Sequence, residues 1–175
     1  MEALYTALQV KTAVFETSPS KVPGPDGFHA AFFGKEWHVV GPRITKVCLE
    51  TLNGVSSIAP LNQKHIVLIP KNKTPRRMAD YWPISLRNVV YKFIIKTLAN
   101  RLKTMLGMLT SENQSAFVPR RLISDNLIVA FELMHSMKRK NNGSKGWMGL
   151  KLNMSKAYDR VEWGFLDAMM EKNGI

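Results

Sequence analysis

Apolar residues recur at helical spacing near the N-terminus. The pattern predicts a helix over residues 2–17, with Leu4, Leu8 and Phe15 loosely on one side. Residues 18–27 contain three prolines and two glycines, which interrupt any regular element. We therefore expect one helix followed by a fixed turn or loop.

A second helix is expected where apolar residues again follow helical spacing. It should open at Gly41-Pro42, because proline is favoured in the first turn of a helix. Asn53-Gly54 is a typical helix end. The apolar positions of this pattern are Val40, Ile44, Val47 and Leu52.

Two short segments in the middle of the chain read as strands. Residues 65–69 (HIVLI) form an apolar, β-branched run closed by Pro70, which predicts a buried strand. Residues 84–86 are a candidate partner strand. The basic segment 72–80 between them predicts a loop.

Two further helices are predicted downstream of these strands. One should start at Val89, and the other should run from a cap at Ser124 and Asp125 to about Lys138. The positions expected on one face of the first are Val90, Ile94, Leu98, Leu102 and Met105. The positions expected to point inward from the second are Leu127, Phe131 and Met134.

The C-terminal segment predicts a turn at 138–146, a strand at 147–152, a polar turn at 153–155 and a helix over about 160–172. Helices thus come first, and strands mixed with helices follow. This order predicts an α+β fold that is helix-rich and has a few short strands.

The composition narrows the class of protein. The 175 residues are 45% hydrophobic and 22% charged, which is typical of a folded chain. The single cysteine, Cys48, excludes a disulfide framework or a cysteine zinc site and favours a reducing compartment. No apolar run approaches the roughly 18 residues of a membrane helix, and the N-terminus lacks the features of a secretory signal. We therefore expect an intracellular, non-secreted protein without a membrane partner.

The positive charge is concentrated in one stretch. The formal net charge is +12, and residues 62–121 hold twelve basic and two acidic side chains, a net of +10. Short basic runs are often only solvated helix faces. Here most of the excess charge lies in about a third of the chain. This concentration favours, over a solvated helix face, a surface that binds the phosphates of a nucleic acid.

Several segments together carry a resemblance to a known family. They are PGPDGF (23–28), HIVLIPK (65–71), DYWPISLRNVVYK (80–92), LANRL (98–102), SENQSAFVP (111–119), DN (125–126) and LNMSKAYDRVEW (152–163). In this order and spacing they resemble the reverse transcriptase of non-LTR (LINE-type) retrotransposons, in the form common in plant genomes.

The resemblance implies part of a right-hand polymerase fold, with fingers and an incomplete palm. Residues 1–20 would be a lead-in, residues 21–146 the fingers region, and residues 147–175 the first palm strand and its helix, with the palm truncated. The implied partners are an RNA template, an RNA–DNA hybrid and deoxynucleoside triphosphates. The implied cofactor is Mg²⁺ or Mn²⁺, and the implied location is the nucleus or cytoplasm.

The catalytic motif departs from the family at its metal-binding position. Asn153 stands where the family has the aspartate that ligates both metals, and an amide lacks the negative charge and one acceptor oxygen. Met154 would offer only its backbone carbonyl. Asp159 is not a family ligand, and it reads as a helix-start residue paired with a basic side chain. The family's second pair of carboxylates lies further along its chain. The resemblance therefore implies that this chain is catalytically dead alone and does not bind the metal productively.

The nucleotide-binding positions are partly kept. Lys71 matches the lysine that meets the triphosphate, although a lysine that closes an edge strand is common. Trp82 replaces an arginine and cannot make its forked contact to phosphate. Tyr158 matches the steric gate under the sugar, with plain core packing as the alternative. Arg120 stands where the family usually has glycine, which would add strain if φ is positive there.

Three functions remain open for this chain. It is an inactive part of an RNA-directed DNA polymerase, a non-catalytic RNA or RNA–DNA-binding remnant, or the non-functional product of a decayed reading frame. The three departures, Asp→Asn, Arg→Trp and Gly→Arg, each fit a single C→T or G→A transition, as expected of decay. The side chains expected to contact nucleic acid are Arg76, Arg77, Lys92, Lys96, Arg101, Lys103 and Arg121.

Overall fold

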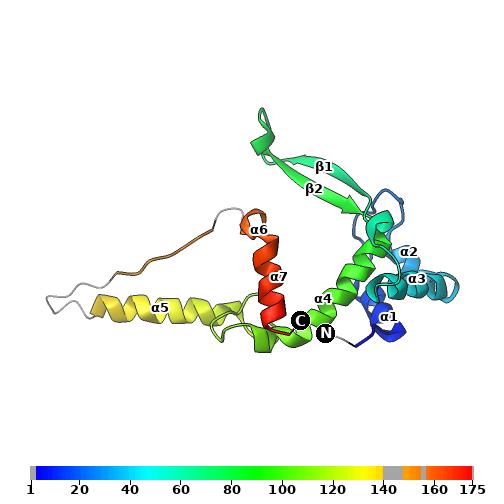
Figure 1. The fold of residues 1–175 in the computed structure, drawn as a ribbon. Helices are drawn as coiled ribbons and strands as arrows, with labels where there is room; N and C mark the ends of the chain where they lie inside the picture. Colours follow the sequence, from blue (N-terminus) through cyan, green and yellow to red (C-terminus); the bar gives the residue numbers. More distant parts are fainter. Residues whose placement is uncertain (1–2, 140–147, 155–156, 175) are drawn as a thin grey trace. The chain divides into compact units, whose positions relative to one another are not determined.

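The computed structural model describes residues 3–139, 148–154 and 157–174, except for the side chain of Tyr158. The chain divides into two compact units, with the boundary between Leu102 and Lys103. The first unit holds α1 (Ala7–Glu16), α2 (Ala30–Lys35), α3 (Trp37–Leu52), the 3-10 turn η1 (Ala59–Leu61), β1 (Lys64–Pro70), the 3-10 turn η2 (Met78–Asp80), β2 (Tyr81–Arg87) and most of α4 (Val89–Leu109) (Figure 1). The second unit holds the end of α4, α5 (Ile123–Arg139), α6 (Ala157–Arg160) and α7 (Trp163–Lys172). The α+β class is confirmed.

Helix α1 begins later than the hydrophobic pattern predicts. Thr6 caps it, because its hydroxyl accepts the Gln9 backbone N–H while the Gln9 side chain accepts the Thr6 N–H. The buried residues are Val10, Ala13 and Val14. The face that we expected, Leu4, Leu8 and Phe15, is exposed. The small and β-branched side chains face the core instead, and α1 packs there against α2 and α3.

The proline rule misplaced the start of α3. The helix begins at Trp37, so Pro42 lies inside it, and the preceding helix α2 was not predicted at all. The Trp37 ring packs so closely on Gly41 that an added Cβ would lie 2.8 Å from it. Trp37 lies in the first turn of α3, one turn before Gly41, and the Gly-Pro pattern does not show that the helix already includes it. The predicted end is confirmed, since Asn53 is the C-cap and Gly54 has a φ of +76°.

The core of the first unit joins four helices. Its buried members are Val10, Val14, Ala30, Phe33, Cys48, Val89, Phe93 and Ile94. Phe33 and Phe93 meet edge to face with ring centroids 5.5 Å apart. Burial raises the pKa of the Cys48 thiol to about 12, so this thiol stays protonated and is a packing residue rather than a nucleophile.

Strands β1 and β2 form an antiparallel hairpin that projects from the helices of the first unit (Figure 1). The register pairs Lys64 with Arg87 at one end and Pro70 with Tyr81 at the other. Both predicted strands are confirmed, but the predicted burial of β1 is wrong, because all seven of its residues are exposed. The described part of the chain supplies no third strand to this sheet, and neither face of β1 is covered.

Helix α4 starts at Val89 as predicted, but the residues that it buries are mostly not the ones expected. Val89, Phe93, Ile94 and Thr97 are buried, and only Ile94 belongs to the predicted set. The core contacts the first turns of α4 alone, so the expected positions further along, such as Leu102 and Met105, are not buried. Local hydrophobic spacing cannot show that only one end of a helix is packed.

The second unit departs most from the sequence pattern. Helix α5 is present, but Leu127, Phe131 and Met134 are 71–72% exposed rather than inward. Residues 148–152 form no strand, because the described chain offers no neighbour for pairing, and Trp147 and most of the predicted turn lie outside the described residues. The predicted final helix is present as α7, and the short helix α6 precedes it. Within the described residues, no helix is long and apolar enough to cross a bilayer.

Candidate functional site

The outer end of the β1–β2 hairpin gathers a lysine and a tryptophan. The backbone N–H of Lys71 donates to the Asp80 carbonyl at 2.8 Å and continues the pairing of the two strands. The Lys71 ammonium donates to the Ala79 carbonyl at 2.7 Å. It also lies 4.4 Å from the centroid of the Trp82 ring, which is a cation–π contact. Two of the three sequence-predicted nucleotide-binding residues, Lys71 and Trp82, are therefore in contact.

The carboxylate of Asp80 organises the loop between the strands. It accepts the backbone N–H groups of Arg76 and Arg77, each at 2.9 Å. These bonds, from Arg76 first and then Arg77, hold the pKa of Asp80 below its ordinary value of 3.8, with a smaller contribution from the Lys71 charge. The side chains of Arg76 and Arg77 are left exposed.

Acid should loosen this loop. A depressed carboxyl pKa means that the stabilisation by Asp80 is present above about pH 3.8 and is lost as the pH falls through its lower folded-state pKa. An NMR titration of the Asp80 carboxyl is expected to give a pKa below 3.8, with the Arg76 and Arg77 amides shifting in parallel. Asp80→Asn should abolish that acid-induced amide shift. A carboxyl that titrates at or above the ordinary value contradicts this assignment.

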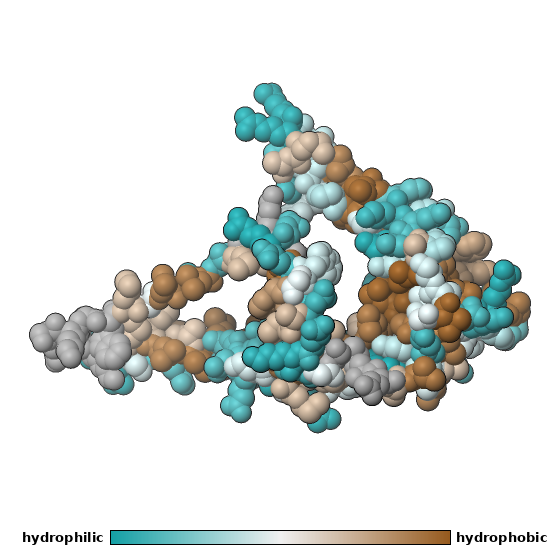
Figure 2. Space-filling model, in the orientation of Figure 1, coloured by the Kyte–Doolittle hydropathy of each residue, from teal (hydrophilic) through white to brown (hydrophobic). Residues whose placement is uncertain are grey.

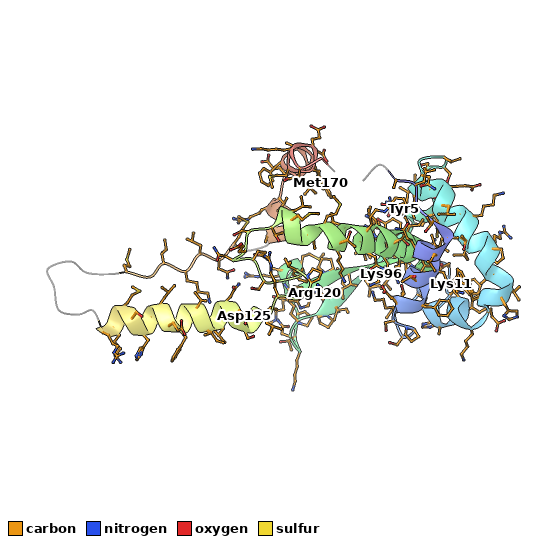
Figure 3. The ribbon with its side chains drawn as sticks, turned by 90° about the horizontal axis from the view of Figure 1, so that it is seen from below. Tyr5, Lys11, Lys96, Arg120, Asp125 and Met170 are labelled. Carbon is orange, nitrogen blue, oxygen red and sulfur yellow. The ribbon has the colours of Figure 1, made fainter. Side chains whose placement is uncertain are left out.

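Three of the α4 side chains that were predicted to bind nucleic acid, Lys92, Lys96 and Arg101, bind other residues of the first unit instead of projecting freely. Lys92 donates to the Val22 carbonyl at 2.7 Å, and its partial burial, followed by the charge of Lys21, lowers the pKa of the Lys92 ammonium. Lys96, which is labelled in Figure 3, pairs with Glu16 of α1 at 3.1 Å. These two side chains connect α4 to the N-terminal third of the chain.

Arg101 holds the segment before α1. Its guanidinium donates to the carbonyls of Ala3 and Leu4 and to the side chain of Gln9. It also stacks 3.3 Å from the centroid of the Tyr5 ring. Lys103, in contrast, is exposed. Sequence reasoning assigned Arg101 to nucleic acid because a cation that binds carbonyls and one that binds phosphates look alike in a pattern.

The PGPDGF segment has a structural role that the sequence did not reveal. Val89, the first residue of α4, donates its N–H to the Asp26 carboxylate at 3.2 Å, and Asp26 donates its own N–H to the Asn88 side chain at 3.2 Å. Gly24 lies directly against the backbone of Arg87 and Asn88. The loop thus caps α4 and secures the junction where β2 meets it.

In the second unit, Arg121 holds together the loop before α5. Its guanidinium donates to the carbonyls of Ser111, Gln114 and Gly107, the second at 2.8 Å. Ser115 donates its hydroxyl to the Asn126 side chain at 3.0 Å, so the SENQSAFVP and DN segments are in contact. Figure 3 labels Arg120 and Asp125, which lie in this loop and in the first turn of α5.

The segment 148–154 is irregular and exposed. Asn153 and Met154 are both exposed, and the side chain of Tyr158 lies outside the described residues. Asp159 is exposed on the short helix α6. Among the described residues there is no group of three or more His, Cys, Asp or Glu side chains that are placed to hold a metal ion.

Comparison with known proteins decides the family. Residues 69–175 match the reverse transcriptase (RNA-dependent DNA polymerase) family.

The chain belongs to the reverse transcriptase family.

A curated relative agrees with this assignment. The chain is 32% identical over 149 residues to the transposon TX1 uncharacterized 149 kDa protein of Xenopus laevis. The match covers 84% of this chain and 11% of that protein, so this reverse transcriptase chain spans about a tenth of its relative. The expectation of a reverse transcriptase segment from a non-LTR retrotransposon is confirmed, and the plant-like form stays a prediction.

Reverse transcriptases depend on divalent metal ions, and the residues of this segment do not fit one. Metal ions of this kind prefer several carboxylates around them. Asn153 offers one amide oxygen and Met154 one backbone carbonyl. Both residues lie on an exposed, irregular segment. The described residues of this reverse transcriptase chain therefore do not make a metal site by themselves.

Arg120 adopts the backbone conformation that its family position suggested. Its φ is +66°, in the left-handed region that favours glycine, so the condition under which the sequence predicted strain is met. Phe117, in the same loop, also has a positive φ of 65°. The loop of this reverse transcriptase chain therefore carries two non-glycine residues in a conformation that L side chains rarely adopt.

Arg120→Gly should stabilise the second unit by about 1 kcal/mol, because glycine removes the left-handed penalty, and this gain exceeds the loss from the greater freedom of the unfolded chain. Urea denaturation followed by circular dichroism measures this. Gly27→Ala is the converse control, because Gly27 has a φ of +72° and open space around it. This variant should lose about as much stability as Arg120→Gly gains. A lower unfolding midpoint for Arg120→Gly contradicts the strain.

Proposed function

We propose that this chain is the fingers and the start of the palm of a right-hand polymerase, and that alone it binds RNA or an RNA–DNA hybrid without extending it. The proposed division is a lead-in at 1–20, fingers at 21–146 and the first palm segment at 147–175. The observation that carries the proposal is the exposed cationic end of the hairpin in the first unit. In addition, the described residues of the catalytic motif in the second unit show no metal-ligating cluster.

Fewer side chains are available to bind phosphates than the sequence suggested. Lys92, Lys96, Arg101 and Arg121 already bind carbonyls or a carboxylate within their own units. The other exposed cations of the basic stretch are the ones best placed to meet phosphates. They are Lys64, Lys73, Arg76, Arg77, Lys103 and Arg120, together with Lys71, whose ammonium also donates to the Ala79 carbonyl.

In a complete enzyme of this family we propose Mg²⁺ as the metal, with deoxynucleoside triphosphates and an RNA template as substrates. When bound, the metal would stabilise the charge on the reacting phosphate oxygens. In this chain the exposed lysines and arginines would position the strand. Because these substrates occur in the nucleus and the cytoplasm, we expect the protein in one of those compartments.

Removing two exposed cations should weaken RNA binding in a salt-dependent way. Arg76→Gln with Arg77→Gln should lower affinity for single-stranded RNA about tenfold at low salt and reduce the slope of log affinity against log salt by about 1.4. Fluorescence anisotropy over a salt series measures both values.

The matched control removes the same charge elsewhere. Lys11 and Lys35 are exposed and lie outside the basic stretch, so Lys11→Gln with Lys35→Gln should leave the slope nearly unchanged. If both double variants lose affinity equally, net charge rather than the hairpin end governs binding. If the parent chain binds no RNA at all, the binding proposal is wrong.

An inert reading-frame product is the second candidate, and one observation favours it. The apolar residues of α5 and α7 have no cover in the described chain, with Phe131 at 72% and Trp163 at 79% exposed. Apolar surface of this extent favours aggregation of an isolated chain. Cooperative unfolding of a monodisperse sample would argue against this candidate.

A further inference from the structure

A large aromatic side chain is exposed at the hairpin end. Trp82 is 59% exposed and pairs across the hairpin with Ile69, which places the two side chains on the same face of the sheet. Lys71 follows Ile69 by two positions, and the alternation of a strand brings it to that face as well. Its ammonium lies over the indole at 4.4 Å. The indole is thus fixed against one cation and still widely accessible.

The loop that joins β1 and β2 at this end of the hairpin is strongly positive. The loop from residue 71 to residue 80 carries Lys71, Lys73, Arg76 and Arg77. The one carboxylate of the loop, Asp80, faces the backbone N–H groups of Arg76 and Arg77. Figure 2 shows hydrophilic surface at the outer end of the hairpin and hydrophobic surface along its strands. The end of the hairpin therefore combines a cationic loop with an exposed indole on β2 that contacts one of its lysines.

This combination selects among ligands. Arginine and lysine alone suit a phosphate group or the backbone of a duplex, whose bases are already stacked inside. A protein interface of comparable apolar character is depleted of lysine at its centre. A single strand carries phosphates and unpaired bases together, and base stacking on an aromatic ring tolerates any sequence.

Building on the proposed nucleic-acid binding, we propose that Trp82 is a stacking site for an unpaired base of single-stranded nucleic acid, whose flanking phosphates meet Lys73, Arg76 and Arg77. The replacement of arginine by tryptophan then exchanges a phosphate contact for a base contact. Lys71 acts as a positioning residue, because its ammonium holds the indole from one side.

The test compares two exposed tryptophans in the full chain. Trp82→Ala should weaken binding of a short labelled oligouridylate about tenfold with an unchanged salt slope, and should leave binding of an RNA duplex within about twofold. Trp82→Phe keeps a stacking ring and should retain most of the affinity. The control is Trp163→Ala, since Trp163 of α7 is 79% exposed and lies far along the sequence from the basic stretch. Far-UV circular dichroism verifies that each variant is folded.

Each outcome has a defined meaning. If the parent binds the oligouridylate and Trp82→Ala binds it as tightly as Trp163→Ala does, stacking is overturned while phosphate binding stands. If Trp82→Ala loses single-strand and duplex binding equally, the indole acts through the loop's structure and the proposal also fails. If the parent binds neither ligand, both this proposal and the proposed function are wrong. A change in self-association alone assigns the indole to a protein contact and overturns the proposal.

Discussion

Gly24→Ala is expected to lower the free energy of unfolding of the first unit by about 3 kcal/mol. An added Cβ would lie 2.2 Å from the carbonyl carbon of Arg87 and 2.4 Å from the backbone N of Asn88. These are backbone atoms at the β2–α4 junction, so no side chain can rotate away to make room. The loop must retreat instead, at the upper end of the range for overpacking substitutions.

Retreat of this loop would break more than one contact. Asp26 would leave the first N–H of α4, and Lys92 would lose the Val22 carbonyl. Loss of a helix cap alone typically costs about 1 kcal/mol. The junction also sets where the hairpin departs from α4, so the substitution should reduce RNA binding together with stability.

The control for this substitution is Gly34→Ala. Gly34 lies in α2, and an added Cβ would meet nothing within 4 Å. Alanine there should be neutral or stabilising by up to about 1 kcal/mol, because alanine is the better helix former. Urea denaturation of both variants, followed by circular dichroism, measures the difference. Equal midpoints would show that the Gly24 contact is not tight in solution.

The chain is also expected to incorporate no nucleotide in a primer-extension assay with Mg²⁺ or Mn²⁺. Replacing one metal-binding carboxylate by an amide forfeits several kcal/mol of charge stabilisation, or roughly a thousandfold in rate. The described residues also hold no cluster of metal-ligating side chains around Asn153. Gel analysis of a labelled primer on an RNA template measures incorporation, with an active reverse transcriptase as the positive control.

Asn153→Asp separates the two causes of inactivity. In this chain it should still give no product, because one restored carboxylate on an exposed segment does not complete a site. Extension by the parent chain would contradict the prediction outright. Extension by Asn153→Asp alone would mean that the single amide, rather than the missing cluster, is what blocks the reaction.

Part of the fold was predictable because its signals are local. The β-branched run closed by Pro70, the helix start at Val89 and the helix end at Asn53-Gly54 all appear as expected. Helix α2 was missed because it has only six residues and no side-chain cap at His29. The φ of Arg120 was anticipated because a glycine position in a family motif carries information on the backbone.

The candidate site was predictable to a smaller degree. Family motifs pointed to Lys71 and Trp82, and the structure brings the two side chains into contact. The same motifs did not show that Asp26 caps α4, because that contact links residues more than 60 positions apart. Lys92, Arg101 and Arg121 bind carbonyls of their own units, which a sequence pattern does not show, and their assignment to nucleic acid stays a prediction.

The sequence by itself pointed to the family and determined the basic character of residues 62–121, because residue identity and order state these directly. The prediction that Asn153 replaces a metal-binding carboxylate rests on the same residue order. Only the tertiary structure decided which apolar faces are buried and which cations are available. Burial depends on partners distant in sequence, as with Val10 and Phe93 in one core. Likewise, Arg101 and Arg77 have the same charge, yet Arg101 binds carbonyls near the N-terminus and Arg77 is exposed in the loop between β1 and β2.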